Sequence, residues 1–309
     1  MVAEKSSPGE RPTTPSDAIV GVDLGGTSVR AGKVQDGTVT RHAQRRISGD
    51  GAEEVVLAEI FATVDEVIDD EVTGIGCGVP SVVDVERGIV YTVEHIPSWR
   101  EVHLREAFEA RYRRPATINN DANAFALGEL HFGKGRGFRH LVGITLGTGV
   151  GSGVVVDGRL YSGANCGAGE IGSIPYRDAT IETYCASHFF HRRAGVGGDV
   201  VYERACRGDV EAVRLFHDYG RELGEAVLIV LYCFDPELIV FGGSITRAFR
   251  LFEPGLRERL ADFAYQHALA RLTIACSEIA DAAILGAAAL HIDARSGPGA
   301  TRAPKTGTR

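Results

Sequence analysis

The chain has 309 residues, of which 44% are hydrophobic and 24% charged, a composition typical of a globular protein with a sizeable core. Its formal net charge of −8 argues against a general nucleic-acid or membrane-surface binder. We find no run of about 18 apolar residues and no apolar leader at the N-terminus. The six cysteines lack paired or clustered spacing. We therefore expect a cytoplasmic protein with reduced thiols, no membrane contact and no nucleic-acid partner.

Residues 1–17 are rich in Ser, Pro, Glu and Thr and predict a disordered tail, and residues 294–309 predict another. The stretch before Ile19 is too short for a DNA-binding domain of about 60–80 residues, so we expect none. Between the tails, strand and helix patterns alternate. In chain order they predict strands 19–24, 28–35 and 38–47, helix 52–69, strand 73–79, two short strands within 84–91, helix 102–111, strand 115–119, helix 121–132, strands 139–146 and 152–157, an irregular stretch 158–175, helices 180–193, 198–206 and 209–234, strand 237–241, helix 245–264, strand 271–275 and helix 281–293.

Two glycine turns stand out in this pattern. An apolar strand leads into Gly147-Thr148-Gly149 and another follows it, and the same arrangement surrounds Gly25-Gly26-Thr27. We call Gly25–Thr27 the first glycine turn and Gly147–Gly149 the second. Glycine lets a ligand approach the backbone closely, and the amides of such a turn can form a concave site for an anion. Either turn alone is equally consistent with an ordinary hairpin. The pair suggests two phosphate-binding turns that close on one polyphosphate from opposite sides.

Each half of the chain opens with one of these turns and continues with further strands and helices. This pattern predicts a duplicated α/β fold with two domains and a cleft between them. We expect a small N-terminal domain over 18–119, joined by the last helix at about 281–293, and a large C-terminal domain over 120–280.

Asp121 is the first candidate for chemistry, because it follows the predicted strand 115–119 and begins a helix. Asn119-Asn120-Asp121 is also a typical helix cap, since Asn and Asp are preferred at that position. Alternatively, Asp121 lies at the mouth of the cleft and accepts a proton from an attacking hydroxyl, as phosphoryl transfer requires. The two roles are compatible.

Glu170 and Glu182 are the next candidates. Glu170 lies in a glycine-dense segment, where a ligand can reach both the carboxylate and the backbone. A carboxylate accepts hydrogen bonds from two neighbouring hydroxyls, which suits a sugar. Glu182 begins a predicted helix, so it is equally consistent with a first-turn acid that interacts with the helix dipole.

Two further strand ends carry glycines. Gly242-Gly243 follows an apolar strand and precedes a helix, where a phosphate or a planar ring could lie close to the helix N-terminus. Gly78-Val79-Pro80 ends another strand and could place backbone groups against a substrate. A tight strand–helix junction explains the first motif equally well, and a simple strand end explains the second.

Together these residues resemble the ROK family, whose name combines repressors, open reading frames and sugar kinases. The resemblance covers about residues 19–293 and rests on six motifs in the family's order. They are Asp23-Leu24-Gly25-Gly26-Thr27, Asn120-Asp121-Ala122-Asn123 with Leu127-Gly128-Glu129, Leu146-Gly147-Thr148-Gly149-Val150-Gly151, Gly163-Ala164-Asn165, Gly169-Glu170-Ile171-Gly172 and Val240-Phe241-Gly242-Gly243.

The resemblance implies the actin-like ATPase (ribonuclease H-like) fold, with ATP and a sugar in the cleft between two domains. It implies that Asp121 is the catalytic base. It also implies a set of sugar-binding residues, to which we add Gly78: Asn120, Asp121, Glu170, Glu182 and, as in some members, Arg30. The implied ATP-binding residues are Asp23, Gly25, Gly26, Thr27, Gly147, Thr148, Gly149, Gly242 and Gly243.

The sequence departs from the family pattern at two places. The family usually has a His followed by a Cys-rich zinc loop, but here the His position is Ser173 and residues 173–181 contain no Cys. A structural zinc ion needs about four ligands, normally Cys or His, so we predict no zinc. His95 stands where the family commonly has Asn. Both positions border the sugar in the family, so they bear on which sugar is preferred.

The sequence therefore predicts an ATP-dependent hexose kinase, specifically a glucokinase that phosphorylates the 6-hydroxyl of glucose. Mg²⁺ is expected to arrive with ATP, with no metal site in the protein itself, and a homodimer is expected from the family. Fructose, mannose, N-acetylmannosamine and N-acetylglucosamine remain alternative substrates. Two different functions on the same fold also stay open, a non-catalytic sugar sensor and a non-sugar ATPase.

Overall fold

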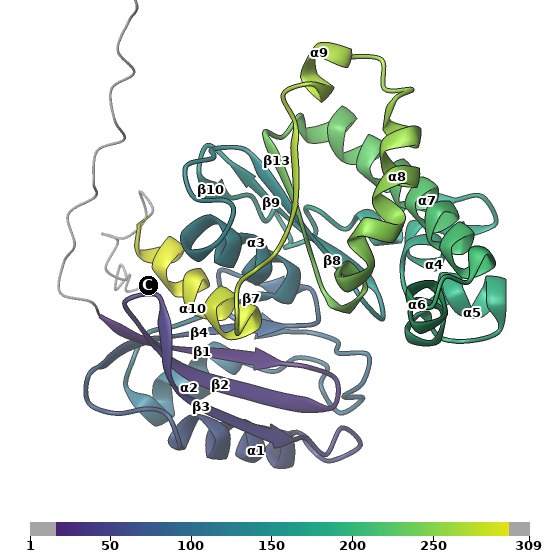
Figure 1. The fold of residues 1–309 in the computed structure, drawn as a ribbon. Coiled ribbons are helices and arrows are strands. Elements are labelled where there is room, and N and C mark those ends of the chain that lie inside the picture. Colours follow the sequence, from purple (N-terminus) through teal and green to yellow (C-terminus); the bar gives the residue numbers. More distant parts are fainter. Residues whose placement is uncertain (1–16, 297–309) are drawn as a thin grey trace, which may run out of the picture.

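The computed structural model describes residues 17–296, and their core is built on two five-stranded sheets (Figure 1). The first sheet has the order β3-β2-β1-β4-β7 and the second has the order β10-β9-β8-β13-β14. The strands of the first are β1 (Ala18–Leu24), β2 (Ser28–Gln35), β3 (Thr38–Arg46), β4 (Val72–Val79) and β7 (Ala116–Asn120). Those of the second are β8 (Leu141–Leu146), β9 (Val150–Val156), β10 (Arg159–Leu160), β13 (Leu238–Gly242) and β14 (Thr273–Cys276).

The two sheets follow one plan. In each, the opening strand forms an antiparallel hairpin with the next strand, β1 with β2 and β8 with β9. On its other side the opening strand begins a parallel series, β1-β4-β7 in one sheet and β8-β13-β14 in the other. The predicted duplication of an α/β unit is therefore confirmed.

Helices α3 (Asp121–Phe132) and α10 (Ala282–Arg295) lie between the two sheets (Figure 1). Glycines let α10 approach the first sheet closely: a Cβ atom on Gly21 would lie 2.0 Å from the Ile284 carbonyl oxygen, and one on Gly76 would lie 1.8 Å from that of Ala287. Only glycine fits at these strand positions. The C-terminal helix thus packs on β1 and β4, close to the beginning of the chain.

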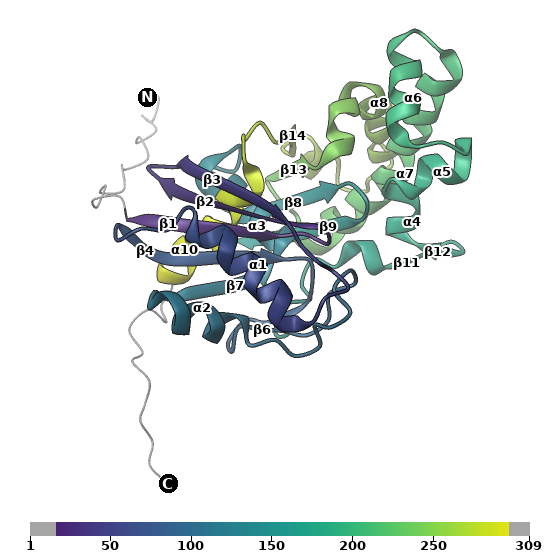
Figure 2. The same ribbon diagram turned by 90° about the horizontal axis from the view of Figure 1, so that it is seen from below.

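The remaining helices cover the outer faces of the sheets. Apolar side chains of α1 (Glu53–Asp65) and α2 (Leu104–Tyr112) pack on the face of the first sheet opposite α10 (Figure 2). The long helix α7 (Val210–Phe234) packs with α8 (Phe249–Leu260) against the second sheet. The smaller elements are β5 (Val83–Asp84), β6 (Ile89–Val90), η1 (Ile171–Ser173), β11 (Pro175–Tyr176), β12 (Ala179–Thr180), α4 (Ile181–Cys185), α5 (His188–Ala194), α6 (Gly198–Cys206), η2 (Ser244–Ala248) and α9 (Gln266–Leu269).

Three predicted helices differ from those observed. The predicted helix 180–193 is two helices, α4 and α5, because Ala186 is extended with φ −99° and ψ −174°. The predicted helix 52–69 ends at Asp65, and the predicted helix 245–264 is η2 followed by α8. Helix α10 continues to Arg295 and so enters the C-terminal tail predicted from residue 294. The rest of both predicted tails, 1–16 and 297–309, lies outside the described residues.

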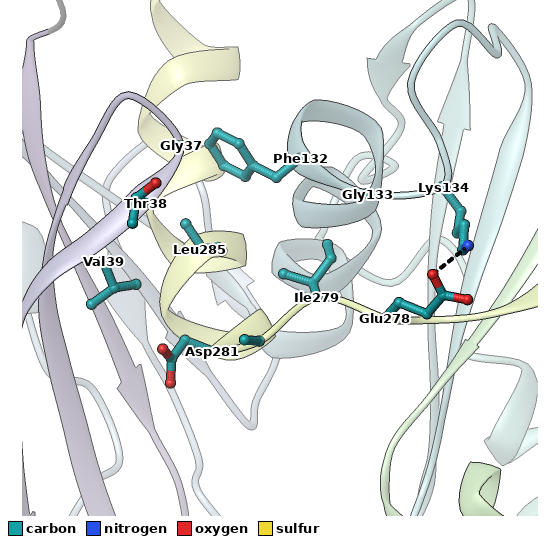
Figure 3. Close-up of a pocket in the computed structure, with 11 residues that line it drawn as sticks. Gly37, Thr38, Val39, Phe132, Gly133, Lys134, Glu278, Ile279, Asp281 and Leu285 are labelled. Atoms are coloured by element: carbon teal, nitrogen blue, oxygen red, sulfur yellow. Dashed lines mark ion pairs between the residues drawn. The ribbon is translucent and has the colours of Figure 1, made fainter.

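A cavity of about 490 Å³ lies where the chain passes between the two sheets (Figure 3). The chain reaches the second sheet after α3 and returns between β14 and α10, and an ion pair of 2.6 Å between Lys134 and Glu278 joins these two segments. The β2–β3 hairpin forms the opposite wall. Within residues 17–296, no helix is long and apolar enough to cross a membrane.

Candidate active site

The carboxyl ends of the parallel strands of the first sheet bring several predicted site residues together. Asp23 of β1 is paired with Gly78 of β4, and Gly78 is paired with Asn119 of β7. A Cβ atom on Gly78 would lie 3.5 Å from the Cα atom of Asp121. Ligands bind at this edge in many α/β sheets, and here the edge presents two carboxylates, Asp23 and Asp121.

The junction between β7 and α3 orients Asp121. The cap of α3 is Asn120, whose side-chain oxygen accepts hydrogen bonds from the amides of Ala122 (2.8 Å) and Asn123 (3.3 Å). Asp121 is the first residue of the helix, and its Oδ1 accepts a hydrogen bond from the Ala122 amide at 2.8 Å. The helix cap is therefore supplied by Asn120, and Asp121 adds a charge at the positive end of the helix dipole.

The surroundings of Asp121 raise its pKa to about 6. Burial is the main cause, because the neighbouring protein atoms displace water that would solvate the charge, although solvent still reaches the side chain. Repulsion by Asp23 is the next cause, and Glu170 also contributes. The pKa of Glu170 is itself raised by burial and by repulsion from Glu182. Repulsion between carboxylates therefore links Asp121 to Asp23 and Glu170, and Glu170 to Glu182.

Arg30 partly offsets this concentration of negative charge. It lies opposite Asp23 in the β1–β2 hairpin, and its Nε and Nη2 donate to Oδ2 of Asp23 at 3.0 and 2.6 Å. The guanidinium group is half exposed at the edge of the site. To make its predicted contact with a substrate, Arg30 would therefore have to share or break its ion pair with Asp23.

The second glycine turn and Gly242-Gly243 lie side by side at the equivalent edge of the second sheet. Thr145 of β8 is paired with Gly242 of β13. Gly243 has φ +88°, and a Cβ atom there would lie 2.3 Å from the Leu146 carbonyl oxygen, so the position requires glycine. The structure thus brings the second glycine turn together with Gly242-Gly243, the residues predicted to lie by the adenosine.

A cavity of about 330 Å³ lies next to Gly243 and was not foreseen from the sequence. It is lined in part by Ser244 and by residues from α5 and α6, including Tyr202. The Arg247 guanidinium group lies 4.7 Å from the centre of the Tyr202 ring. No local motif marks these side chains, because they come from separate helices.

The loop that carries Glu170 is fastened to the β7–α3 junction by Cys166. The buried thiol donates to Oδ1 of Asn119 at 3.1 Å and lies 3.7 Å from Nδ2 of Asn123. Gly169, with φ +93°, packs against β9, where the Ser152 hydroxyl donates to its carbonyl oxygen. From the sequence, Cys166 is simply a reduced core thiol, whereas the structure shows that it links the Glu170 loop to the strand before Asp121.

Glu182 lies against the second glycine turn. Its Oε2 accepts a hydrogen bond from the Val150 amide at 2.9 Å, directly after the turn. A Cβ atom on Gly149 would lie 2.5 Å from the same oxygen. Glu182 therefore occupies the space left by the missing side chain of Gly149, a contact that its predicted role toward a sugar does not explain.

A model of the ROK family matches residues 19–294 of the sequence. The chain belongs to the ROK family. A ROK glucokinase from Streptomyces griseus, solved in complex with glucose and AMPPNP, superposes with a TM-score of 0.73 at 26% identity, covering 88% of this chain and 98% of that one. The present chain accordingly has the actin-like ATPase fold of that kinase.

Two curated ROK relatives act as sugar kinases. The glucokinase of Thermotoga maritima is 31% identical, with 89% of this chain and 98% of that protein aligned. The N-acetyl-D-glucosamine kinase of Erwinia tasmaniensis is 28% identical, with 78% of this chain and 88% of that protein aligned. Together with the structural match, these relatives identify the class of enzyme, and the present ROK protein is a sugar kinase.

Both departures from the ROK pattern can be located in the structure. A Cβ atom on Gly26 would lie 2.3 Å from the His95 ring, so His95 covers the first glycine turn. Ser173 ends η1, and the β11–β12 hairpin that follows is held by Tyr176 and Arg177, which bind Glu222 at 3.0 and 2.8 Å. Among residues 17–296, no three His, Cys, Asp or Glu side chains are grouped so as to hold a metal ion.

Proposed function

We propose that this ROK kinase is a glucokinase, which transfers the γ-phosphate of ATP to the 6-hydroxyl of glucose. The position of Asp121 is the observation that carries the proposal. Its carboxylate lies at the N-terminus of α3, beside Asp23 and Gly78, with a pKa of about 6. A group of this pKa is ionised at neutral pH and still basic enough to take a proton from a hydroxyl in the transition state.

The sugar side of the proposed reaction uses Asn120, Asp121 and Glu170. Asp121 accepts the proton of the 6-hydroxyl while the oxygen of that hydroxyl attacks the γ-phosphorus of ATP. The attack is in line with the bond between the γ-phosphorus and the leaving oxygen of ADP, which breaks. Glu170 accepts hydrogen bonds from neighbouring hydroxyls. Gly78 leaves room for the sugar beside Asp121, and Arg30 lies within the same edge of the sheet.

The nucleotide side uses the two glycine turns. In this proposal their amides and threonine hydroxyls hold the phosphates, and adenosine lies beside Gly242-Gly243, in the cavity lined by Tyr202. Mg²⁺ would accompany ATP, and the Asp23 carboxylate offers the hard oxygen ligand or water acceptor that this ion prefers. Positioning and charge neutralisation supply most of the catalysis in phosphoryl transfer.

The similarity to a kinase crystallised with glucose and AMPPNP supports both glucose and ATP as substrates. The similarity to an N-acetyl-D-glucosamine kinase supports another hexose as the alternative. His95 and Ser173 replace residues that border the sugar in the family. The sugar preference of family members with the usual residues therefore does not transfer to this chain through these two positions. A homodimer and a cytoplasmic location remain predictions.

A coupled assay of ADP release across glucose, fructose, mannose, N-acetylmannosamine and N-acetylglucosamine tests the proposal. We expect ADP release only when a hexose is present, with the highest kcat/KM for glucose. A higher kcat/KM for another hexose would reassign the substrate. ADP release without any sugar would indicate a non-sugar ATPase, whereas sugar binding without ADP release would indicate a sensor. Metal analysis of the purified protein tests the predicted lack of zinc, which about one Zn per chain would overturn.

A further inference from the structure

Asn119 is a buried side chain near the end of β7, and its hydrogen bonds join the first sheet to later parts of the chain. It is 3% exposed and is paired with Gly78 in the sheet. Its Oδ1 accepts from the thiol of Cys166 at 3.1 Å and from Nδ2 of Asn123 at 2.9 Å. Its Nδ2 donates to the Ser162 hydroxyl oxygen at 3.3 Å. One of these partners belongs to α3, and the other two belong to a loop that follows β10.

This loop comprises residues 161–170 and ends at Glu170, the predicted sugar ligand. It has contacts that do not involve Asn119. The Ala168 amide donates to the Ser162 carbonyl oxygen at 3.1 Å, which closes the loop upon itself. Both ends are fixed to β9, one by the Tyr161 amide, which donates to a β9 carbonyl oxygen at 2.8 Å, and the other by a β9 hydroxyl. The contacts with Asn119 therefore fix the middle of the loop against the first sheet, rather than shaping the loop or its ends.

Cys166 reaches Asn119 from an unusual backbone conformation. Its φ is +59°, in a region that residues other than glycine rarely adopt. The side chain is nevertheless buried among apolar residues of the core of the first sheet. A side chain from a loop anchored on the second sheet is thus inserted into the core of the first, where its thiol donates to Asn119.

Helix α3 and the loop rest on the same strand. A Cβ atom on Gly153 of β9 would lie 2.6 Å from the Ala122 carbonyl oxygen, so the first turn of α3 packs directly on β9. Asp121 and Glu170 therefore share one support. Asn119 belongs to the first sheet, and its side chain binds both the helix and the loop. It thus connects the edge of the first sheet to the elements that carry the two carboxylates.

We propose that Asn119 is a positioning residue for the sugar side of the site, which acts through its bonds to Ser162 and Cys166. These bonds hold the loop that carries Glu170 at a fixed distance from the edge of the first sheet. A hexose that contacts both the loop and this edge needs that spacing, whereas ATP does not contact the loop in the proposed arrangement. The inference rests on the proposed function, and it predicts a selective effect on the KM for the hexose.

The role of the thiol is tested by two substitutions that keep the Cβ atom. Cys166→Ser keeps a donor for Asn119, whereas Cys166→Ala removes it, and both retain the backbone restriction at φ +59°. We expect Cys166→Ala to raise the KM for the hexose about threefold to tenfold, the effect of losing one hydrogen bond, with an unchanged KM for ATP. Cys166→Ser should stay within about twofold of wild type. An unchanged hexose KM in Cys166→Ala, or an equal rise in both KM values, would overturn the proposal.

Ser162→Ala removes the acceptor of the second bond and leaves Asn119 and the helix cap in place. Combined with Cys166→Ala, it should raise the hexose KM further than either substitution alone. In an Asn119→Ala background neither substitution should have a further effect, because the shared partner is already missing. An equal effect of Cys166→Ala in both backgrounds would show that the thiol does not act through Asn119. Thermal unfolding identifies variants with a general loss of structure, and the Ser162 and Cys166 variants remain decisive if Asn119→Ala does not fold.

Amide hydrogen exchange of residues 163–168, measured without ligands, tests the positioning independently of turnover. We expect exchange about threefold to tenfold faster in Cys166→Ala than in wild type, because a weaker anchor lets the loop open more often. Cys166→Ser should exchange as wild type does. If no hexose is phosphorylated, the proposed function fails, and exchange still decides whether Asn119 holds the loop. Equal exchange in wild type, Cys166→Ala and the double variant would show that it does not, whatever the reaction.

Discussion

The two glycine turns occupy equivalent places in the two sheets, yet their surroundings differ. The first turn follows Asp23 and faces Arg30 across the β1–β2 hairpin. In the second sheet the position equivalent to Asp23 is Thr145, which is uncharged. Each turn is closed by a bond of its own, from the Gly25 amide to the Ser28 carbonyl oxygen at 2.8 Å and from the Gly147 amide to the Gly149 carbonyl oxygen at 3.1 Å. Outside its hairpin, the first turn is held by the Ile47 amide, which donates to the Thr27 carbonyl oxygen at 3.1 Å. The second is held at both ends, where the Ser187 amide donates to the Gly147 carbonyl oxygen and Glu182 accepts from the Val150 amide, each at 2.9 Å.

This difference suggests a division of work between the duplicated halves. The edge of the first sheet carries Asp23 and Asp121, which suit a cation and the transfer of a proton. The edge of the second sheet presents glycine turns and amides, which suit phosphate groups. We therefore propose that one hairpin plan serves two kinds of chemistry, and the following variants test whether the chemistry is divided in this way.

The largest effect is expected at Asp121. Asp121→Asn keeps the shape of the side chain but removes the base, so we expect kcat to fall about 10²–10⁴-fold. The KM for the hexose is expected to change little, because the amide can still bind a hydroxyl. Steady-state kinetics with calorimetric measurement of sugar binding checks both values. A kcat close to that of wild type would mean that proton transfer does not depend on the first sheet.

The second effect concerns the glycines of the two turns. A Cβ atom on Gly147 would meet only Ser244 Oγ at 4.0 Å, so Gly147→Ala should leave the melting temperature unchanged. If phosphate occupies that space, the KM for ATP should rise by about tenfold or more. On the first turn, a Cβ atom on Gly26 would lie 2.3 Å from the His95 ring and 2.9 Å from the His95 Cβ atom. The effect of Gly26→Ala should therefore be only partly relieved when His95→Ala is added, because alanine keeps that Cβ atom. An unchanged KM for ATP in Gly147→Ala would reduce the second turn to an ordinary hairpin.

The third effect is on pH dependence. Because Asp121 must be ionised to act as a base, kcat/KM should fall as the pH decreases through about 6, where its pKa lies. Repulsion by Asp23 contributes to that raised pKa, so Asp23→Asn should lower the pKa and move the acid limb to lower pH. The position of the limb is read from kcat/KM profiles of both proteins. A limb that stays in place in Asp23→Asn would contradict the electrostatic coupling.

The smallest effect is expected at Arg30. Arg30→Met removes the charge that offsets Asp23, so the acid limb should move to higher pH, opposite to Asp23→Asn. The shift should be small because the Arg30 side chain is 45% exposed, so solvent screens its charge. For the same reason, the free energy of unfolding should change by less than about 1 kcal/mol, as denaturant titration can measure. A large loss of stability would give Arg30 a structural role instead.

Most of the fold could be predicted from the sequence because the signals are local. Alternating apolar residues and glycine turns place β1, β2, β8 and β9 within a few residues of their observed bounds. The neighbourhood of Asp23, Gly78 and Asp121 also follows from local signals, because all three lie at carboxyl ends of parallel strands.

Tertiary contacts account for what the sequence could not predict. The break between α4 and α5 coincides with a hydrogen bond from the Ser187 amide to the distant Gly147 carbonyl oxygen, which no local pattern contains. The orientation of Glu182 toward Val150 and the link from Cys166 to Asn119 also join residues far apart in the chain. Helical periodicity alone favours one continuous helix over 180–193 and leaves Cys166 as an ordinary core thiol.

The ion pair between Lys134 and Glu278 has a mechanical consequence. It ties together the two segments that connect the sheets, at the end of α3 remote from Asp121. Helix α3 has 12 residues and is therefore about 18 Å long. With this end as a pivot, a rotation of about 10° would carry the Asp121 end through about 3 Å, given the length of the helix. A small rotation at the Lys134 end of α3 would therefore displace Asp121 by about the length of a hydrogen bond.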